Sequence, residues 1–207
     1  RRDPSLRDPP VSALRGQLDR LRQHFEVDDN QADTVLGVEG LKARLADKVG
    51  ALTAATDPLT AEVIAAAPHL KAICNFAVGY NNIDLAACSK AGVMATNTPG
   101  VLDDTTADLA WALLMASARR LPAAERWLRN GEWKGWQFIQ WLGTDVHHAT
   151  LGILGMGRIG QTVARRALGF DMKVIYHKRT PLAAATEAAC RATWVDKETL
   201  LREADFL

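Results

Sequence analysis

The sequence predicts an α/β fold built on parallel sheets, and three observations carry this prediction. Short apolar runs alternate with helical segments before residue 98, the tripeptide Thr98-Pro99-Gly100 interrupts the chain, and a glycine-rich turn from Gly155 to Gly160 stands between an apolar run and a helix. Alternation with short connections is typical of parallel strands covered by helices. Proline and glycine together mark a break in regular structure, so a domain boundary is expected near residues 98–101.

Composition favours a soluble globular protein that acts on a small molecule. The chain has 207 residues, of which 48% are hydrophobic and 24% charged, enough for one core or for one domain and part of another. The net charge is +1 with opposite charges interleaved, so the sequence indicates neither a nucleic-acid surface nor a membrane-surface patch. No apolar run reaches the roughly 18 residues of a membrane span, and the opening RRDPSLRDPP lacks the apolar core of a signal peptide. The three cysteines, Cys74, Cys88 and Cys190, show no C-x-x-C spacing and are expected to be reduced thiols in the cytoplasm.

The part before the break alternates helices and strands. Apolar residues recur at helical spacing over 14–25 and 38–45, which predicts two helices. Strands are then expected at 50–52, 70–77 and 93–95, with helices at 60–67 and 84–91 between them. Residues 1–101 are therefore assigned to a first α/β domain.

After the break, a long helix is expected to be capped by Asp103 or Asp104 and to be apolar on most faces, which predicts burial. Pro122 interrupts or restarts it. The stretch 131–143, GEWKGWQFIQWLG, then holds Trp133, Trp136 and Trp141 in a loop. Two interpretations stay open for so much aromatic surface: a flap folded onto its own domain, or a subunit interface, where tryptophan is enriched.

The strongest chemical signal is the run TLGILGMGRIG, which starts at Thr150. It places G-x-G-x-x-G between a strand and a helix, with a second strand over 172–177. Gly155 permits the tight turn, Gly157 leaves space for a pyrophosphate, and Gly160 lets the helix pack closely on the strand. The backbone of Met156, Arg158 and Ile159 completes the turn, and the helix N-terminus offers amide N–H groups to phosphates. The sequence therefore predicts a Rossmann-type NAD(P)-binding domain over 102–207, incomplete within this chain.

The residues after the second strand favour NADP(H) over NAD(H). An NAD site places an Asp or Glu there to bind the ribose 2′-hydroxyl, whereas cations suit the 2′-phosphate of NADP. This chain has His177, Lys178, Arg179 and Thr180 instead. The alternative is a solvated basic turn, with cofactor preference set elsewhere.

These motifs together resemble the D-isomer specific 2-hydroxyacid dehydrogenases, and among them the bacterial glyoxylate/hydroxypyruvate reductases of the 2-ketogluconate (2-ketoaldonate) reductase type. The resemblance covers nearly the whole chain. Its marks are VGYNNID over 78–84, NTPGVL over 97–102, TTADLAWALLMASARRL from Thr105, the tryptophan-rich loop, and GTDVHHATLGILGMGRIG from Gly143.

The resemblance implies a flavodoxin-like substrate domain before about residue 101 and a cleft between the two doubly wound domains. It implies that backbone amides at Val78 and Gly79 hold the carboxylate of a small 2-keto acid, that the loop carrying Leu59 lies near the same pocket, and that Thr106 touches the cofactor. It also implies a homodimer in which the loop 131–149, with Trp133, Trp136 and Trp141, reaches across to the partner.

The expected reaction is the NADPH-dependent reduction of glyoxylate, hydroxypyruvate or 2-ketogluconate to the D-2-hydroxy acid. The family's Arg, Glu and His are expected beyond Leu207, so no catalytic residue is assigned within 1–207. The chain is expected to be a piece of a longer protein, inactive alone. Two alternatives remain: a non-enzymatic NAD(H)-sensing corepressor-like protein of the same fold, and a phosphoglycerate- or formate-type dehydrogenase, which usually has an acidic residue at positions 177–179.

No metal site is predicted. The adjacent His147 and His148 would point to opposite faces of a strand, and no other His or Cys cluster is near them in sequence.

Overall fold

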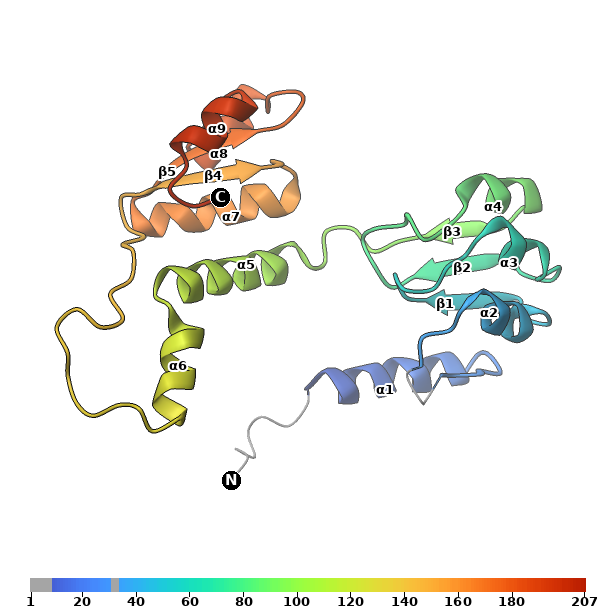
Figure 1. Cartoon of the computed structure of the whole chain (residues 1–207). Helices are drawn as coiled ribbons and strands as arrows, with labels where there is room; N and C mark the ends of the chain where they lie inside the picture. Colours follow the sequence, from blue (N-terminus) through green and yellow to red (C-terminus); the bar gives the residue numbers. More distant parts are fainter. Residues whose placement is uncertain (1–8, 31–33) are drawn as a thin grey trace. The chain divides into compact units, whose positions relative to one another are not determined.

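A computed structural model of the chain describes residues 9–30 and 34–207. The chain divides into two compact units, Arg1–Asn97 and Thr98–Leu207 (Figure 1). Residues 1–8, which form most of the opening stretch RRDPSLRDPP, lie outside the described residues.

The first unit is a three-stranded parallel sheet with the strand order β1-β2-β3. Apolar side chains from the strands and from the helices between them form a single core, which includes Leu59, Val63 and Ile73. Two helices begin at side-chain caps, because Thr60 and Asp84 accept hydrogen bonds from the backbone N–H groups of the first turn. The elements are α1 (Pro9–Arg22), α2 (Val38–Leu45), β1 (Gly50–Thr53), α3 (Ala61–Ala65), β2 (Ala72–Asn75), α4 (Leu85–Ala91) and β3 (Met94–Thr96).

The second unit begins with two helices and continues as a parallel sheet in the order β4-β5-β6. Its elements are α5 (Asp103–Ala118), α6 (Leu121–Arg129), β4 (Thr150–Leu154), α7 (Arg158–Ala167), a 3-10 turn (Leu168–Phe170), β5 (Lys173–His177), α8 (Ala184–Cys190), β6 (Ala192–Trp194) and α9 (Lys197–Glu203).

The strand order of this sheet reverses at β4. From β4 the chain moves outward to β5 and β6, then returns so that Phe206 pairs in parallel with Leu151 on the other side of β4. Helices α7 and α9 cover opposite faces of the sheet (Figure 1). In open α/β sheets such a switch point leaves a crevice at the carboxyl ends of the strands, which is where ligands bind.

Helix α5 packs along α7 and against the 3-10 turn that follows it. The Trp111 ring lies 5.0 Å from the Phe170 ring, and the Arg166 guanidinium pairs with the Asp108 carboxylate at 2.5 Å. The expectation that α5 is buried on most faces is wrong for the described chain, because Leu109 and Leu113 are each 60% exposed.

The predicted fold class is confirmed, since both units are α/β with parallel sheets. Pro122 lies in the first turn of a restarted helix, which was one of the two alternatives, because Arg120 takes a left-handed conformation and α6 begins at Leu121.

The prediction of a strand at His147 and His148 is wrong. This segment is irregular, His148 has a φ of 63°, and the two rings touch edge to face at 4.9 Å instead of pointing apart.

Candidate cofactor and substrate sites

The glycine turn begins where β4 ends, at the switch point of the sheet. Gly155 has a φ of 102°, a left-handed conformation that side chains rarely adopt. Its N–H donates to the His177 carbonyl at 2.9 Å, so the turn is fastened to the end of β5. The glycine turn and the basic residues 177–180 therefore lie at the same edge of the sheet.

Gly157 and Gly160 lack side chains for different reasons. A Cβ at Gly160 would collide with the Gly155 carbonyl oxygen and would come within 3.3 Å of Ile153 Cγ2. A Cβ at Gly157 would meet nothing within 4 Å and would project into open space. Gly160 is thus required by packing inside the protein, whereas the space beside Gly157 is free for a ligand.

The start of α7 suits an anion. Gly157 is the N-cap of this helix, and no side chain caps the amides that follow it. The first N–H groups of a helix have no intrahelical acceptor and carry the positive end of the helix dipole. These features fit the pyrophosphate of a dinucleotide, held by the backbone between Gly155 and Gly160.

The side chains of the turn are divided between core and solvent. Met156 is 1% exposed and packs in the core, so only its backbone can face a ligand, while Arg158 is exposed. A hollow of about 570 Å³ next to the turn is lined by apolar side chains of α5 and β4 together with Gly155, Ile159 and Gly160. Gly157 itself does not line this hollow.

The basic turn after β5 presents two free cations. Lys178 is half-buried and Arg179 is exposed, and neither forms an ion pair within the described residues. His177 is held differently: its Nδ1 lies 2.9 Å from the Val195 carbonyl oxygen, and its ring lies 5.8 Å from the Trp194 ring. Only Nε2 of His177 is left for a ligand.

Two aromatic residues that the sequence interpretation missed hold this turn in place. The Trp194 indole N–H donates to the Lys178 carbonyl at 3.0 Å. The buried Tyr176 hydroxyl accepts a hydrogen bond from the Leu182 N–H at 2.8 Å, which closes the segment that carries Thr180. Burial raises the pKa of Tyr176, and hydrogen bonding to Glu187 raises it further, so the phenol is neutral near pH 7.

Thr106 lies half-buried in the first turn of α5, where its N–H donates to the Leu102 carbonyl at 2.9 Å. Its contact with a cofactor stays a prediction.

The predicted substrate residues of the first unit fall into two groups. Val78 and Gly79 lie in the loop after β2, where Val78 is half-buried and Gly79 is exposed. Leu59 is fully buried in the core, and its backbone pairs with the segment around Ile83. The Leu59 side chain is therefore closed to ligands from solvent, and its predicted role concerns the loop alone.

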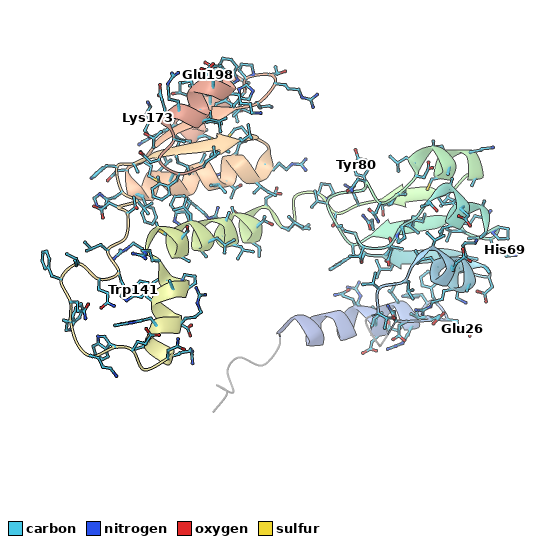
Figure 2. All side chains as sticks on the ribbon, in the orientation of Figure 1. Glu26, His69, Tyr80, Trp141, Lys173 and Glu198 are labelled. Carbon is cyan, nitrogen blue, oxygen red and sulfur yellow. The ribbon has the colours of Figure 1, made fainter. Side chains whose placement is uncertain are left out.

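The tryptophan-rich loop over 131–149, called the aromatic loop from here on, has some side chains packed against the protein and others exposed to solvent. Trp141, which Figure 2 labels, packs against Trp127 of α6 with ring centroids 5.7 Å apart. The Arg120 guanidinium lies over the Trp141 ring, 5.1 Å from its centroid. Trp136 and Phe138 are 97% and 96% exposed, and Trp133 is 52% exposed. The loop thus combines the flap interpretation, at Trp141, with a large outward apolar surface.

Within the described residues, no helix is long and apolar enough to cross a membrane. The same residues contain no group of three or more His, Cys, Asp or Glu side chains placed to hold a metal ion.

Comparison with known proteins identifies relatives over nearly the whole chain. Residues 111–207 match the model of the D-isomer specific 2-hydroxyacid dehydrogenase, NAD binding domain. A glyoxylate reductase of Thermococcus onnurineus is 44% identical over 191 residues, which cover 90% of this chain and 57% of the relative.

Solved structures similar to this chain are also found. A protein of Thermus thermophilus superposes with a TM-score of 0.85 at 42% identity, over 92% of this chain and 59% of that one. A glyoxylate reductase of Paecilomyes thermophila has a TM-score of 0.68 at 36% identity, over 81% of this chain and 52% of that one. The chain spans less than three fifths of the length of these relatives.

Proposed function

Because this chain belongs to the D-isomer specific 2-hydroxyacid dehydrogenase family, we propose that the protein reduces a small 2-keto acid to the D-2-hydroxy acid with NADPH. The observation that carries the proposal is the glycine turn at the switch point, with open space beside Gly157 and an uncapped helix behind it. The glyoxylate reductases among the relatives make glyoxylate the first substrate to test.

The residues of the second unit would hold the dinucleotide. The backbone N–H groups at the start of α7 would bind the pyrophosphate, and Lys178 and Arg179 would face the 2′-phosphate at the end of β5. When bound, the nicotinamide supplies a hydride to the carbonyl carbon of the keto acid. The part of the protein within 1–207 orients the cofactor and the carboxylate of the substrate, and we assign it no proton donor.

The substrate carboxylate would be bound in the first unit, at the loop after β2. Backbone amides at Val78 and Gly79 suit this task because they donate hydrogen bonds without adding a charge. Hydroxypyruvate and 2-ketogluconate share the 2-keto carboxylate with glyoxylate and stay within the proposal.

The reaction is tested with the full-length protein and NADPH against glyoxylate, hydroxypyruvate and 2-ketogluconate. We expect one NADPH, one proton and one keto acid to give one NADP⁺ and one 2-hydroxy acid: achiral glycolate from glyoxylate, and the D-isomer from hydroxypyruvate and 2-ketogluconate. We expect no turnover by the 207-residue chain alone. Binding of NADPH without turnover of any keto acid would refute the enzymatic proposal.

The preference for NADPH is tested by the double variant Lys178→Ala/Arg179→Ala. Hydrogen bonds to charged groups contribute about 1.5–3 kcal/mol, so loss of contacts to the phosphate should raise the Kd for NADPH at least about tenfold. The Kd for NADH should change less than about threefold, since NADH lacks that phosphate. Arg191→Ala, an exposed cation after α8, is the control. Equal weakening of both cofactors would refute the 2′-phosphate role.

We further propose a homodimer formed through the aromatic loop, because Trp136 and Phe138 are almost entirely exposed and interfaces enrich such residues. Replacing both by Ser should convert a dimer to a monomer in sedimentation velocity, and a monomeric full-length wild type would contradict it. We also propose the cytoplasm as the location, because all three cysteines are free thiols.

A further inference from the structure

The loop after β2 is tied from the inside by two asparagine side chains. Asn97 Nδ2 donates to the Val78 carbonyl at 2.8 Å, and Asn75 Nδ2 donates to the Gly79 carbonyl at 2.8 Å. Asn75 ends β2, whereas Asn97 directly follows β3 and is the last residue of the first unit. Two consecutive peptide groups are therefore fixed by side chains from the ends of two neighbouring strands.

Because peptide groups are planar and trans, the two hydrogen bonds to the carbonyls of Val78 and Gly79 also determine where the next N–H groups point. In a trans peptide the N–H points opposite to the C=O of the preceding residue, and no described peptide bond is cis. Because Asn97 holds the Val78 carbonyl, the Gly79 N–H points away from Asn97. Because Asn75 holds the Gly79 carbonyl, the Tyr80 N–H points away from Asn75.

These N–H groups are open to a ligand. Neither the Gly79 N–H nor the Tyr80 N–H has an acceptor within the described residues. Gly79 is exposed, and Tyr80 is 53% exposed and projects from the loop (Figure 2). The loop thus places its carbonyls on the protein side and leaves these two donors unpaired.

Closing the loop alone would not require this arrangement, because carbonyls of an exposed loop can bind water. Asn75 is instead 1% exposed, and burial of an amide is costly unless its hydrogen bonds are made. Its Oδ1 accepts from the Thr53 hydroxyl at 3.3 Å, so the asparagine itself is fixed by the end of β1. Asn82 extends this network: its Oδ1 accepts from Asn75 Nδ2 at 3.5 Å, and its Nδ2 donates to the carbonyls of Ala54 and Asp57.

We propose that Asn97 is a positioning residue for carboxylate binding: its amide fixes the Val78–Gly79 peptide plane so that the Gly79 N–H faces the substrate carboxylate. Asn75 fixes the next peptide in the same way. The inference rests on the proposed function, because it assumes that a carboxylate binds at this loop. It adds a determinant of substrate affinity that touches neither the substrate nor the cofactor.

The test uses the full-length protein with Asn97→Asp, which keeps the shape of the side chain, removes the N–H donor and adds a negative charge, and with Asn97→Ser, which removes the amide without adding a charge. The KM for glyoxylate should rise about tenfold, the size of one hydrogen bond to a charged ligand, while kcat and the Kd for NADPH stay within about twofold. Asn97→Gln, which retains an amide donor, should recover part of the affinity. Asn30→Ala is the matched control, because Asn30 Nδ2 also donates to a backbone carbonyl, that of Thr34, at the surface.

A second readout does not depend on turnover. Titration of ¹⁵N-labelled protein with oxalate, an unreactive two-carbon dicarboxylate, should shift the Gly79 amide resonance in the wild type and in Asn30→Ala, and much less in Asn97→Asp. An unchanged KM together with an unchanged oxalate shift in Asn97→Asp would overturn the inference. If Asn97→Asp does not fold, Asn97→Ser decides by the same two measurements.

The two proposals fail separately. Absence of glyoxylate turnover by the wild type, with an oxalate shift at Gly79 that depends on Asn97, would refute the reaction and support the positioning role. Turnover with a KM that is insensitive to Asn97→Asp would support the reaction and refute the positioning role.

Discussion

Replacement of Gly160 by alanine tests whether the glycine turn is built as described. The added methyl group would collide with the Gly155 carbonyl oxygen and crowd Ile153 Cγ2. Overpacking costs about 1–3 kcal/mol, and the upper value applies here because a backbone carbonyl cannot rotate away. Alanine is better than glycine inside a helix by about 1 kcal/mol, which offsets part of the cost. We therefore expect Gly160→Ala to lower the free energy of unfolding of the second unit by about 2 kcal/mol.

Urea unfolding followed by tryptophan fluorescence isolates this effect. All six tryptophans lie at or beyond Trp111, in the second unit, so the signal reports on that unit alone. Gly157→Ala is the matched control, because its methyl would meet no protein atom and its φ of −79° suits any residue. We expect it to lower the free energy of unfolding by about 0.5 kcal/mol, through a poorer N-cap. The described geometry is refuted if Gly160→Ala is as stable as wild type, or if both variants lose the same amount.

Three further changes test other parts of the fold. Gly152→Ala would place a methyl 2.6 Å from Ala204 Cβ and 3.2 Å from Leu200 Cδ1. It should therefore destabilise the second unit by about 1–2 kcal/mol in the same fluorescence assay. The control Gly169→Ala, whose methyl would meet no atom within 4 Å, should change the stability by less than about 0.5 kcal/mol. The pKa of Tyr176 is raised in the folded state. The contribution of its neutral phenol to folding stability is therefore fully present below the pKa of an unfolded tyrosine, and it is lost as pH rises above about 10. Tyr176→Phe should therefore flatten the alkaline decline in the urea-unfolding stability of the second unit; a decline as steep as that of the wild type would contradict the assignment. Asp84→Ala removes the carboxylate that accepts the Ala87 N–H at 2.9 Å, and should cost about 1 kcal/mol by circular dichroism, with faster hydrogen exchange at Ala87; unchanged exchange would show that the cap is not formed.

Local spacing was sufficient to predict the glycine turn. The three glycines have roles that depend on neighbours within a few residues: a positive φ at Gly155, open space at Gly157 and close packing at Gly160. Strand and helix alternation likewise predicted the parallel sheets, because each strand and the helix after it form one local unit. The boundary near Thr98 follows from backbone restrictions that proline and glycine impose on their neighbours.

The missed features depend on contacts between residues distant in sequence. His177 is bound by the Val195 carbonyl, and Trp194 by the Lys178 carbonyl, across the β5–β6 pair. Asn97 meets Val78 only because β3 lies beside β2. No periodicity or motif in a single sequence encodes such pairs. A polar residue at or just beyond the end of an apolar strand, as at Asn75 and Asn97, is the one signal that could have indicated them.

At Leu59, the prediction from the family resemblance concerns the loop, whereas the structure shows the place of the side chain. The resemblance placed its loop near the substrate, whereas the structure buries the side chain completely in the core of the first unit. Leu59 also anchors the chain to Ile83, close to the loop that carries Gly79. In the described structure, Leu59 stabilises the position of the loop that carries Gly79, through its burial in the core and its backbone pairing with Ile83.

Calorimetric titration of the protein with NADPH and with NADH tests most directly whether the Gly155–Gly160 turn holds a nicotinamide dinucleotide. We predict binding of both cofactors to the wild type with the lower Kd for NADPH, and a large loss of affinity for both in Gly157→Ala, whose methyl would occupy the space beside the start of α7. Failure of the wild type to bind either cofactor, or unchanged affinities in a folded Gly157→Ala variant, would contradict the assignment of this turn as the cofactor site.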